Sequence, residues 1–188
     1  QFGRNFNQTL EKVALPDGLR TLVFGQEFAQ SLENVTLPNG LQNLTFGRNF
    51  NQSLEKVAFP SGLHTLTFGQ DFNQSLENVA LPRSLKDLTL GAFFNQDFEK
   101  VDLPSGLQNL TFGRKFNQSL ELVTLPSRLR NLTLGQHFDQ GLGNMPYGLE
   151  IQKSAGQSSS PMGQRSIGQA VSALKASGLR SKNTWSSM

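Results

Sequence analysis

Cysteine is absent from this 188-residue sequence, which excludes a disulfide framework and any metal site built on thiolates. Histidine occurs only at His64 and His137, far apart and without a carboxylate at ligand spacing, so we expect no metal and no cofactor. No apolar run approaches the ~18 residues of a membrane helix, so we expect no direct membrane span. No Ser/His/Asp grouping, Walker loop or dinucleotide fingerprint is present, and the sequence predicts a protein that is not an enzyme.

Charge is divided unevenly along the chain. Residues 1–150 carry 12 Lys/Arg and 14 Asp/Glu, whereas the remaining residues carry five basic side chains and no acidic one. The near-neutral first part argues against an array that binds nucleic acid. We therefore divide the chain into a repeat domain (1–151), a flexible linker rich in Gly, Ser, Pro and Gln (152–165) and a basic tail (166–188).

The strongest positive signal is a period of 22 residues. A Phe-Gly or Leu-Gly dipeptide opens each unit without a slip, with its first member at Phe2, Phe24, Phe46, Phe68, Leu90, Phe112 and Leu134. A fixed period of this length is typical of a solenoid, in which each repeat buries its apolar face against its neighbours.

One unit, residues 46–67, illustrates the expected coil. Val57-x-Phe59 and Leu66-x-Phe68 have the period-2 spacing of strands, and Pro60 closes the first of them. We expect the glycine that follows the second strand to adopt positive φ. The pattern predicts an all-β solenoid of about seven coils, each with two bends and two strands that form two short parallel sheets.

Three polar columns recur almost without variation. Glutamine occupies the same place in every unit, and asparagine precedes it in most of them, from Asn7 to Asn117. We interpret these amides as an inward ladder that hydrogen-bonds the backbone between coils. A glycan on the asparagines would then block stacking, which favours an intracellular or intraorganellar location over secretion. The glutamates from Glu11 to Glu121 form the third column, and we expect them to cap backbone amides.

The unit LPxGLxxLTFGxxFNQSLExV resembles the FNIP repeat, a leucine-rich-like repeat abundant in protists. Phe50-Asn51, Pro60, Leu63 and Phe68-Gly69 fall where that pattern places them, although Gln-Ser stands where the family has Ile-Pro. The repeats also resemble Phe-Asn-Gln-Ser-Leu-Glu repeats of algal and dinoflagellate proteins. The resemblance covers residue 2 to about residue 143, and it implies a leucine-rich-like solenoid that binds proteins and carries out no catalysis.

The two ends depart from the pattern. Met145-Pro146 stands in a shortened last unit, which we interpret as a capping turn. Gln1 lies inside a unit, so we expect either further residues before it or an end that something else covers. In the tail, Ile167, Val171 and Leu174 share one helical face, and a helix is expected over 167–177. This helix would dock on the solenoid or on a partner, and Trp185 beyond it would serve as an anchor.

The variable outward columns are the expected binding surface. One row consists of Arg20, Gln42, His64, Lys86, Gln108 and Arg130. Phe93 and Leu122 are apolar exceptions in polar columns and are candidate interface anchors.

We predict a non-catalytic scaffold, an accessory or linker subunit that contacts other protein subunits, with a large membrane-associated complex as one candidate. An alternative is a lattice- or ice-binding solenoid that uses the threonine column Thr45, Thr67, Thr89, Thr111 and Thr133. A third is an adaptor that recruits a partner through the tail helix.

Overall fold

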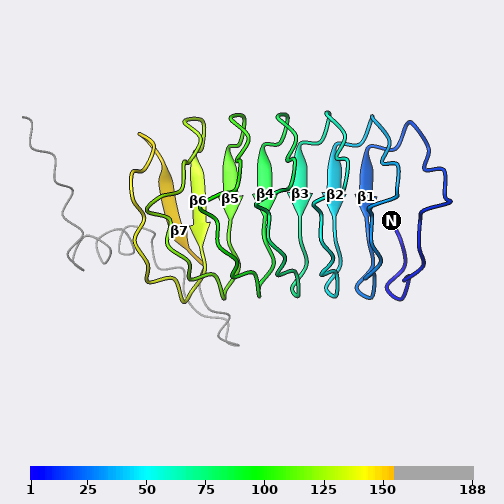
Figure 1. The fold of residues 1–188 in the computed structure, drawn as a ribbon, viewed down its shortest axis with the longest axis horizontal. Helices are drawn as coiled ribbons and strands as arrows, with labels where there is room; N and C mark the ends of the chain where they lie inside the picture. The colour runs from blue at the N-terminus through cyan, green and yellow to red at the C-terminus, as the bar shows by residue number, and fades with distance from the viewer. Residues whose placement is uncertain (155–188) are drawn as a thin grey trace, which may run out of the picture.

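The computed structural model describes residues 1–154, and the predicted helix at 167–177 and the linker from residue 155 on lie outside the described part. Seven strands form one parallel sheet in sequence order (Figure 1). They are β1 (Thr21–Val23), β2 (Asn43–Thr45), β3 (Thr65–Thr67), β4 (Asp87–Thr89), β5 (Asn109–Thr111), β6 (Asn131–Leu134) and β7 (Glu150–Lys153).

Each strand pairs in parallel with the equivalent strand of the next coil. Leu44 pairs with Leu66, and Leu66 pairs with Leu88, so the register equals the sequence period. The chain climbs by one strand per coil and makes about six turns (Figure 1). The predicted β-solenoid is therefore confirmed.

The prediction of a second sheet is wrong. The segment around Val57 and Phe59 is enclosed between two tight turns, in which the Val57 amide donates to the Leu54 carbonyl and the Leu63 amide donates to that of Pro60. Too few residues remain between the turns to form a ladder. Each coil therefore has one strand and three turns, not two strands and two bends.

We name the three turns by their most regular residue. In the coil formed by residues 68–89, which ends in β4, the Gly turn spans Gly69–Phe72, the Glu turn spans Leu76–Val79 and the Pro turn spans Pro82–Leu85. In the last two, the amide of the fourth residue donates to the carbonyl of the first, at 3.2 Å and 3.0 Å. Equivalent residues in the other coils share these names.

The core consists of apolar columns that run along the solenoid axis. One phenylalanine column stacks without a break, with centroids 6.0 to 6.2 Å apart in successive coils. Its members are Phe6, Phe28, Phe50, Phe72, Phe94, Phe116 and Phe138. Because each ring contacts its copies above and below, a coil gains most of its burial from its neighbours.

The glycine column allows close approach of backbones and does not supply positive φ. A Cβ on Gly69 would lie 1.9 Å from the carbonyl oxygen of Gly47 in the preceding coil, and one on Gly47 would lie 1.7 Å from that of Gly25. Within residues 1–154, positive φ occurs only at Gly143 and Gly148, which corrects the expectation for Gly69. No larger residue fits where the coils are this close.

The amide ladder exists, but it lies at the surface and not inside. Asparagine Oδ1 accepts the backbone amide one coil later at 2.8 to 3.0 Å, in the pairs that begin at Asn7, Asn51, Asn73, Asn95 and Asn117. Residues 1–154 contain no fully buried polar side chain, so the predicted inward orientation is wrong. The argument that a glycan on these asparagines would block stacking, and the location inferred from it, therefore lose their basis.

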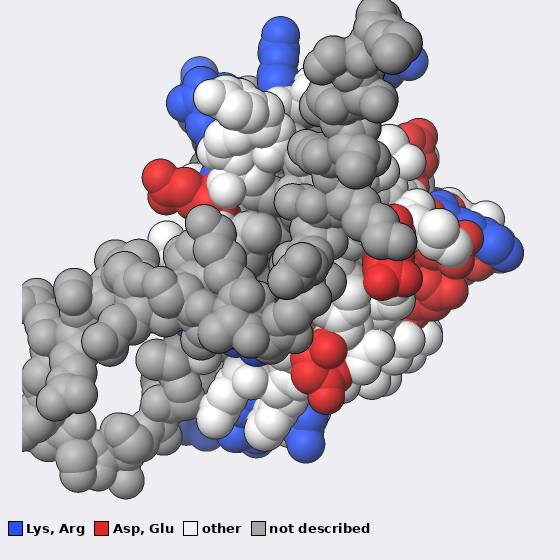
Figure 2. Space-filling view, turned by 90° about the vertical axis from the view of Figure 1, so that its left-hand side faces the viewer, with Lys and Arg blue, Asp and Glu red and all other residues white. Residues whose placement is uncertain are grey.

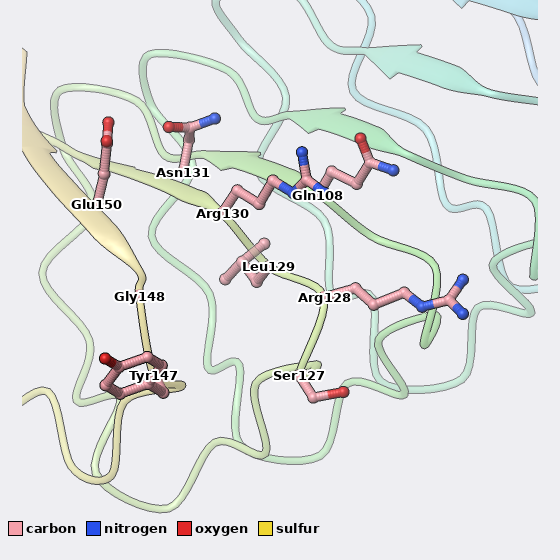
Figure 3. Close-up of a pocket in the computed structure, with 9 residues that line it drawn as sticks. All are labelled: Gln108, Ser127, Arg128, Leu129, Arg130, Asn131, Tyr147, Gly148 and Glu150. Carbon is pink, nitrogen blue, oxygen red and sulfur yellow. The ribbon is translucent and has the colours of Figure 1, made fainter.

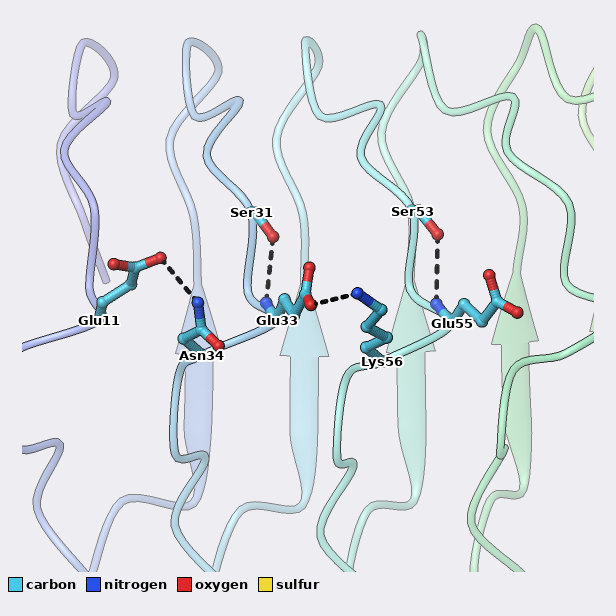
Figure 4. Close-up of polar contacts among 7 residues, drawn as sticks. All are labelled: Glu11, Ser31, Glu33, Asn34, Ser53, Glu55 and Lys56. Atoms are coloured by element: carbon cyan, nitrogen blue, oxygen red, sulfur yellow. Dashed lines mark hydrogen bonds and ion pairs between the residues drawn. The ribbon is translucent and has the colours of Figure 1, made fainter.

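The glutamate column also differs from expectation. In the Glu turns, the serine side chain accepts the glutamate backbone amide, as Ser31 does for Glu33 at 3.1 Å. The carboxylates instead contact the next coil: Glu33 pairs with Lys56 at 2.7 Å, and Glu11 accepts from Asn34 at 3.2 Å (Figure 4). These side chains connect coils and do not cap the backbone.

The last coil is shorter than the others. Asn131 of β6 pairs with Glu150 of β7, 19 residues later instead of 22. Gly143 and Gly148 have φ of 64° and 77°, which lets the chain turn more tightly. Leu142, Met145, Leu149 and Ile151 pack partly buried against the core, as expected of a terminal cap.

Candidate functional site

The outward face of the sheet presents two polar columns in register. The first contains Thr21, Asn43, Thr65, Asp87, Asn109, Asn131 and Glu150, and the second contains Val23, Thr45, Thr67, Thr89, Thr111, Thr133 and Gln152. The middle residue of each strand points into the core, so these columns lie on the opposite face. The predicted threonine column is therefore an ordered feature of the surface.

Side chains of the first column bond to one another along the axis. Asp87 accepts from Asn109 and from the Thr65 hydroxyl, and Asn131 donates to the Asn109 side chain at 2.6 Å. Each group is half-buried and has a partner on the neighbouring strand. The face is thus preorganised, which lowers the entropic cost of binding.

The predicted row from Arg20 to Arg130 is brought together beside this column. The row carbonyls from Arg20 to Gln108 each accept two amides from the next coil; that of Arg20, for example, accepts from Gln42 at 2.8 Å and from Asn43 at 3.0 Å. The backbone therefore holds the row in register while its side chains vary. His64 and Gln108 are half-buried, whereas Arg20, Lys86 and Arg130 are exposed.

Charge is segregated between two sets of turns. The six Pro turns that begin at residues 16, 38, 60, 82, 104 and 126, together with the row residue that follows each one, carry Arg20, Arg83, Lys86, Arg128 and Arg130 against a single acid, Asp17. The Glu turns carry six glutamates against three lysines. In a view along the axis from the β7 end, several acidic groups lie close together on the right, others lie on the left and near the bottom, and basic groups lie at the top, the bottom and the right edge (Figure 2).

A pocket of about 700 Å³ opens where the shortened last coil meets the preceding Pro turn. Its lining includes Arg128, Arg130, Gln108, Tyr147 and Glu150. Tyr147 is fully exposed, and Glu150 lies on the far side of Arg130 from Arg128 (Figure 3). A smaller pocket of about 220 Å³ lies at the other end of the row, next to Arg20 and His64.

The two apolar candidates are exposed but are not brought together. Phe93 lies in a Gly turn and is 38% exposed, and Leu122 lies in a Glu turn and is 72% exposed. Leu122 stands where Lys56 and Lys100 pair with a glutamate of the preceding coil. Among the tail candidates, Ile167, Val171, Leu174 and Trp185 lie outside the described residues.

Two surface groups have perturbed pKa values. Hydrogen bonding to Glu33, supported by its charge, raises the pKa of Lys56. The Asn117 side chain, and then that of Gln140 at 2.6 Å, lower the pKa of Asp139. Both groups belong to contacts that hold the solenoid together, and neither lies in the larger pocket.

Residues 1–154 bring no three His, Asp or Glu side chains close enough to hold a metal ion. The same residues contain no helix with the length and hydrophobicity to cross a bilayer.

Sequence reasoning missed Arg128 and Tyr147. Arg128 occupies a column that is otherwise Gly18, Gly40, Gly62, Ser84 and Gly106, and this interruption was a readable signal. A charge in a glycine column departs from the repeat as clearly as an apolar residue in a polar column does. The exposure of Tyr147 depends on the register of the last coil, which no column predicts.

A single parallel sheet in a coil of fixed period, with core residues that repeat from coil to coil and a variable outward face, defines a leucine-rich-like β-solenoid. The FNIP Repeat family matches residues 6–49, 28–71, 50–93, 94–137 and 116–145. The chain belongs to the FNIP repeat family.

One solved structure shares both fold and sequence with this chain. It is described as the crystal structure of CroV588, a novel circular LRR protein structure, with a TM-score of 0.74 and 45% sequence identity. The match covers 80% of this chain, and this chain spans only 22% of that one. No curated protein matches the sequence.

Proposed function

We propose that this protein is a non-catalytic scaffold that binds other proteins, as an accessory or linker subunit of a larger assembly. The observation that carries the proposal is the contrast between the core columns of the solenoid and the outward row. The core columns hardly vary, whereas the adjacent row changes from Arg20 to Gln42 to His64 while its backbone stays in register. A rigid frame that presents variable side chains is how repeat proteins build binding surfaces.

The route by which a partner binds is tested by co-purification. The full chain is compared with a chain that lacks 166–188 and with a row variant, Arg20→Gln/Lys86→Gln/Arg130→Gln. Glutamine already occupies this row at Gln42 and Gln108, so the row variant should fold normally. A scaffold that uses the outward face keeps its partner without the tail and loses it in the row variant. The opposite result would favour an adaptor that works through the tail helix.

A second candidate function rests on the threonine column. Five threonines from Thr45 to Thr133 lie in register on the outward face, as a lattice-binding surface requires. The adjacent column carries Asp87 and bonded amides, which bind liquid water well and weaken this candidate. Thermal hysteresis of the purified protein decides it, because a lattice-binding face slows ice growth and a protein-binding face does not.

The similarity to algal and dinoflagellate repeats stays a prediction.

A further inference from the structure

We infer that the pocket beside the last coil, together with the adjacent basic Pro turn, binds an extended acidic segment of a partner protein. This inference rests on the proposed scaffold function and identifies the chemistry of the partner. It assigns a binding role to Arg128 and Tyr147, which the repeat pattern leaves unexplained.

The first step of the argument concerns the two arginines of the pocket. Arg128 is the third residue of a Pro turn, where glycine or serine is found in the other coils, and Arg130 follows in the row. Gly18, Gly40, Gly62 and Gly106 in this column do not have positive φ, so the column does not require glycine for its backbone conformation and an arginine fits the turn. Arg128 and Arg130 therefore place two guanidinium groups at one short turn, although the fold of the turn does not require a charge at either position.

Second, neither guanidinium group forms an ion pair with a carboxylate of residues 1–154. In the described part of the chain, the ion pairs are Lys56–Glu33 and Lys100–Glu77, both in the Glu turns. Glu150 lines the pocket but lies on the side of Arg130 away from Arg128 (Figure 3). Arginine binds carboxylates through two parallel hydrogen bonds, so both side chains are suited to an external acidic group.

Third, the shape of the pocket suits a peptide. β7 follows β6 after 19 residues, and a pocket of about 700 Å³ lies between the preceding Pro turn and Tyr147 and Gly148 of the shortened last coil. This volume falls within the range of about 300 to 1,000 Å³ that is typical of ligand sites. Tyr147 supplies a fully exposed aromatic ring at the rim, and such rings commonly anchor peptides.

Fourth, the basic groups recur at a distance that an extended chain can match. Arg83 and Lys86 form a second basic pair two coils before Arg128 and Arg130, and the coil between them carries the neutral Gln108. Two coils cover about 10 Å along the sheet, and three residues of an extended chain also cover about 10 Å. The segment recognised should therefore carry acidic residues three positions apart.

The probe is a fluorescein-labelled peptide with glutamate at every third position, separated by glycine and serine. Binding to the full chain is followed by fluorescence anisotropy. In Arg128→Gly/Arg130→Gln, both positions take residues that the repeat already uses there, so the fold is kept. The matched control is Arg48→Gln/Arg114→Gln in the Gly turns, where Gln26 and Gln70 are native.

We expect the pocket variant to weaken peptide binding by about tenfold and the control variant by less than about twofold. Two further probes test the assignment: a peptide with glutamine for glutamate should not bind, and one with its glutamates in a single block should bind more weakly. Equal losses in the two variants, equal binding of the block peptide, or complete competition by an equal concentration of inorganic phosphate would each overturn the inference. If the pocket variant loses the peptide but still co-purifies with the natural partner, the scaffold proposal survives and the acidic-segment inference fails.

Discussion

The ring of Phe98 packs edge-on against the ring of Phe112 in the next coil, with centroids 4.9 Å apart and planes at 76°. Phe98 occupies a column that is otherwise leucine, and Leu90 occupies one that is mostly phenylalanine. Both exceptions fall in one coil and both side chains are buried. We interpret the larger ring at position 98 as filling volume that the smaller side chain at position 90 leaves in the close-packed core.

This exchange predicts energetic coupling between positions 90 and 98. Phe98→Leu should destabilise the protein by about 1 to 2 kcal/mol through a cavity, and Leu90→Phe by about 1 to 3 kcal/mol through overpacking. The double variant restores the pattern of the other coils and should cost at least about 1 kcal/mol less than the sum. Urea denaturation of the four proteins measures this coupling. Strictly additive values would show that the two exceptions are unrelated.

A second prediction concerns the contact between coils at the glycine column. Gly69→Ala should destabilise the protein by about 3 kcal/mol or more, because its Cβ would overlap the Gly47 carbonyl, which is backbone and cannot rotate away. Gly18→Ala is the matched control, since a Cβ there meets nothing within 4 Å. The melting temperatures of both variants test this. A Gly69→Ala protein as stable as its control would contradict the close approach of the coils.

The surface amide ladder gives a third prediction. Asn73 accepts the Asn95 amide at 2.9 Å and the Gln96 side chain at 3.1 Å, so Asn73→Ala should cost about 1 to 2 kcal/mol. Asn73→Asp keeps an acceptor oxygen and should recover most of the loss. The free energy of unfolding of the two variants distinguishes a hydrogen-bond role from a packing role. Equal losses would exclude the hydrogen-bond role.

The fourth prediction concerns pH. Because hydrogen bonds from Asn117 and Gln140 lower the pKa of Asp139 below its ordinary value of 3.8, its ionised form stabilises the fold. That contribution is complete above the ordinary pKa and is lost as the pH falls through the lowered one. An NMR titration of the Asp139 carboxyl should show the lowered pKa, and Asn117→Ala should raise it. A pKa that does not respond to Asn117→Ala would contradict the assigned cause.

Particular residues show how far the sequence predicts the fold. The period placed Leu66 and Phe68 on one buried face, and the structure agrees, because a solenoid aligns equivalent residues whatever the details of the coil. Val57 and Phe59 have the same spacing and form no strand. The turns on either side leave too few residues between them for a strand. Period-2 spacing alone does not reveal the turn that the Val57 amide closes.

The candidate site was predictable only in part. The row from Arg20 to Arg130 follows from the period alone, and the structure brings it together. The pocket beside Tyr147 depends on how a coil of irregular length pairs with its neighbour, and this register is fixed by packing in three dimensions. The irregular coil was visible in the sequence, but its consequence for the surface was not.

The central claim is that the variable outward row, and not charge in general, binds the partner. The direct test is the dissociation constant of the co-purified partner for the full chain, for the row variant Arg20→Gln/Lys86→Gln/Arg130→Gln and for a control, Arg4→Gln/Arg48→Gln/Arg114→Gln. The control removes equal charge from the Gly turns, where glutamine is also native. We predict that the row variant weakens binding by about tenfold or more and the control by less than about twofold. Equal effects of the two variants, or no effect of the row variant, would contradict the claim.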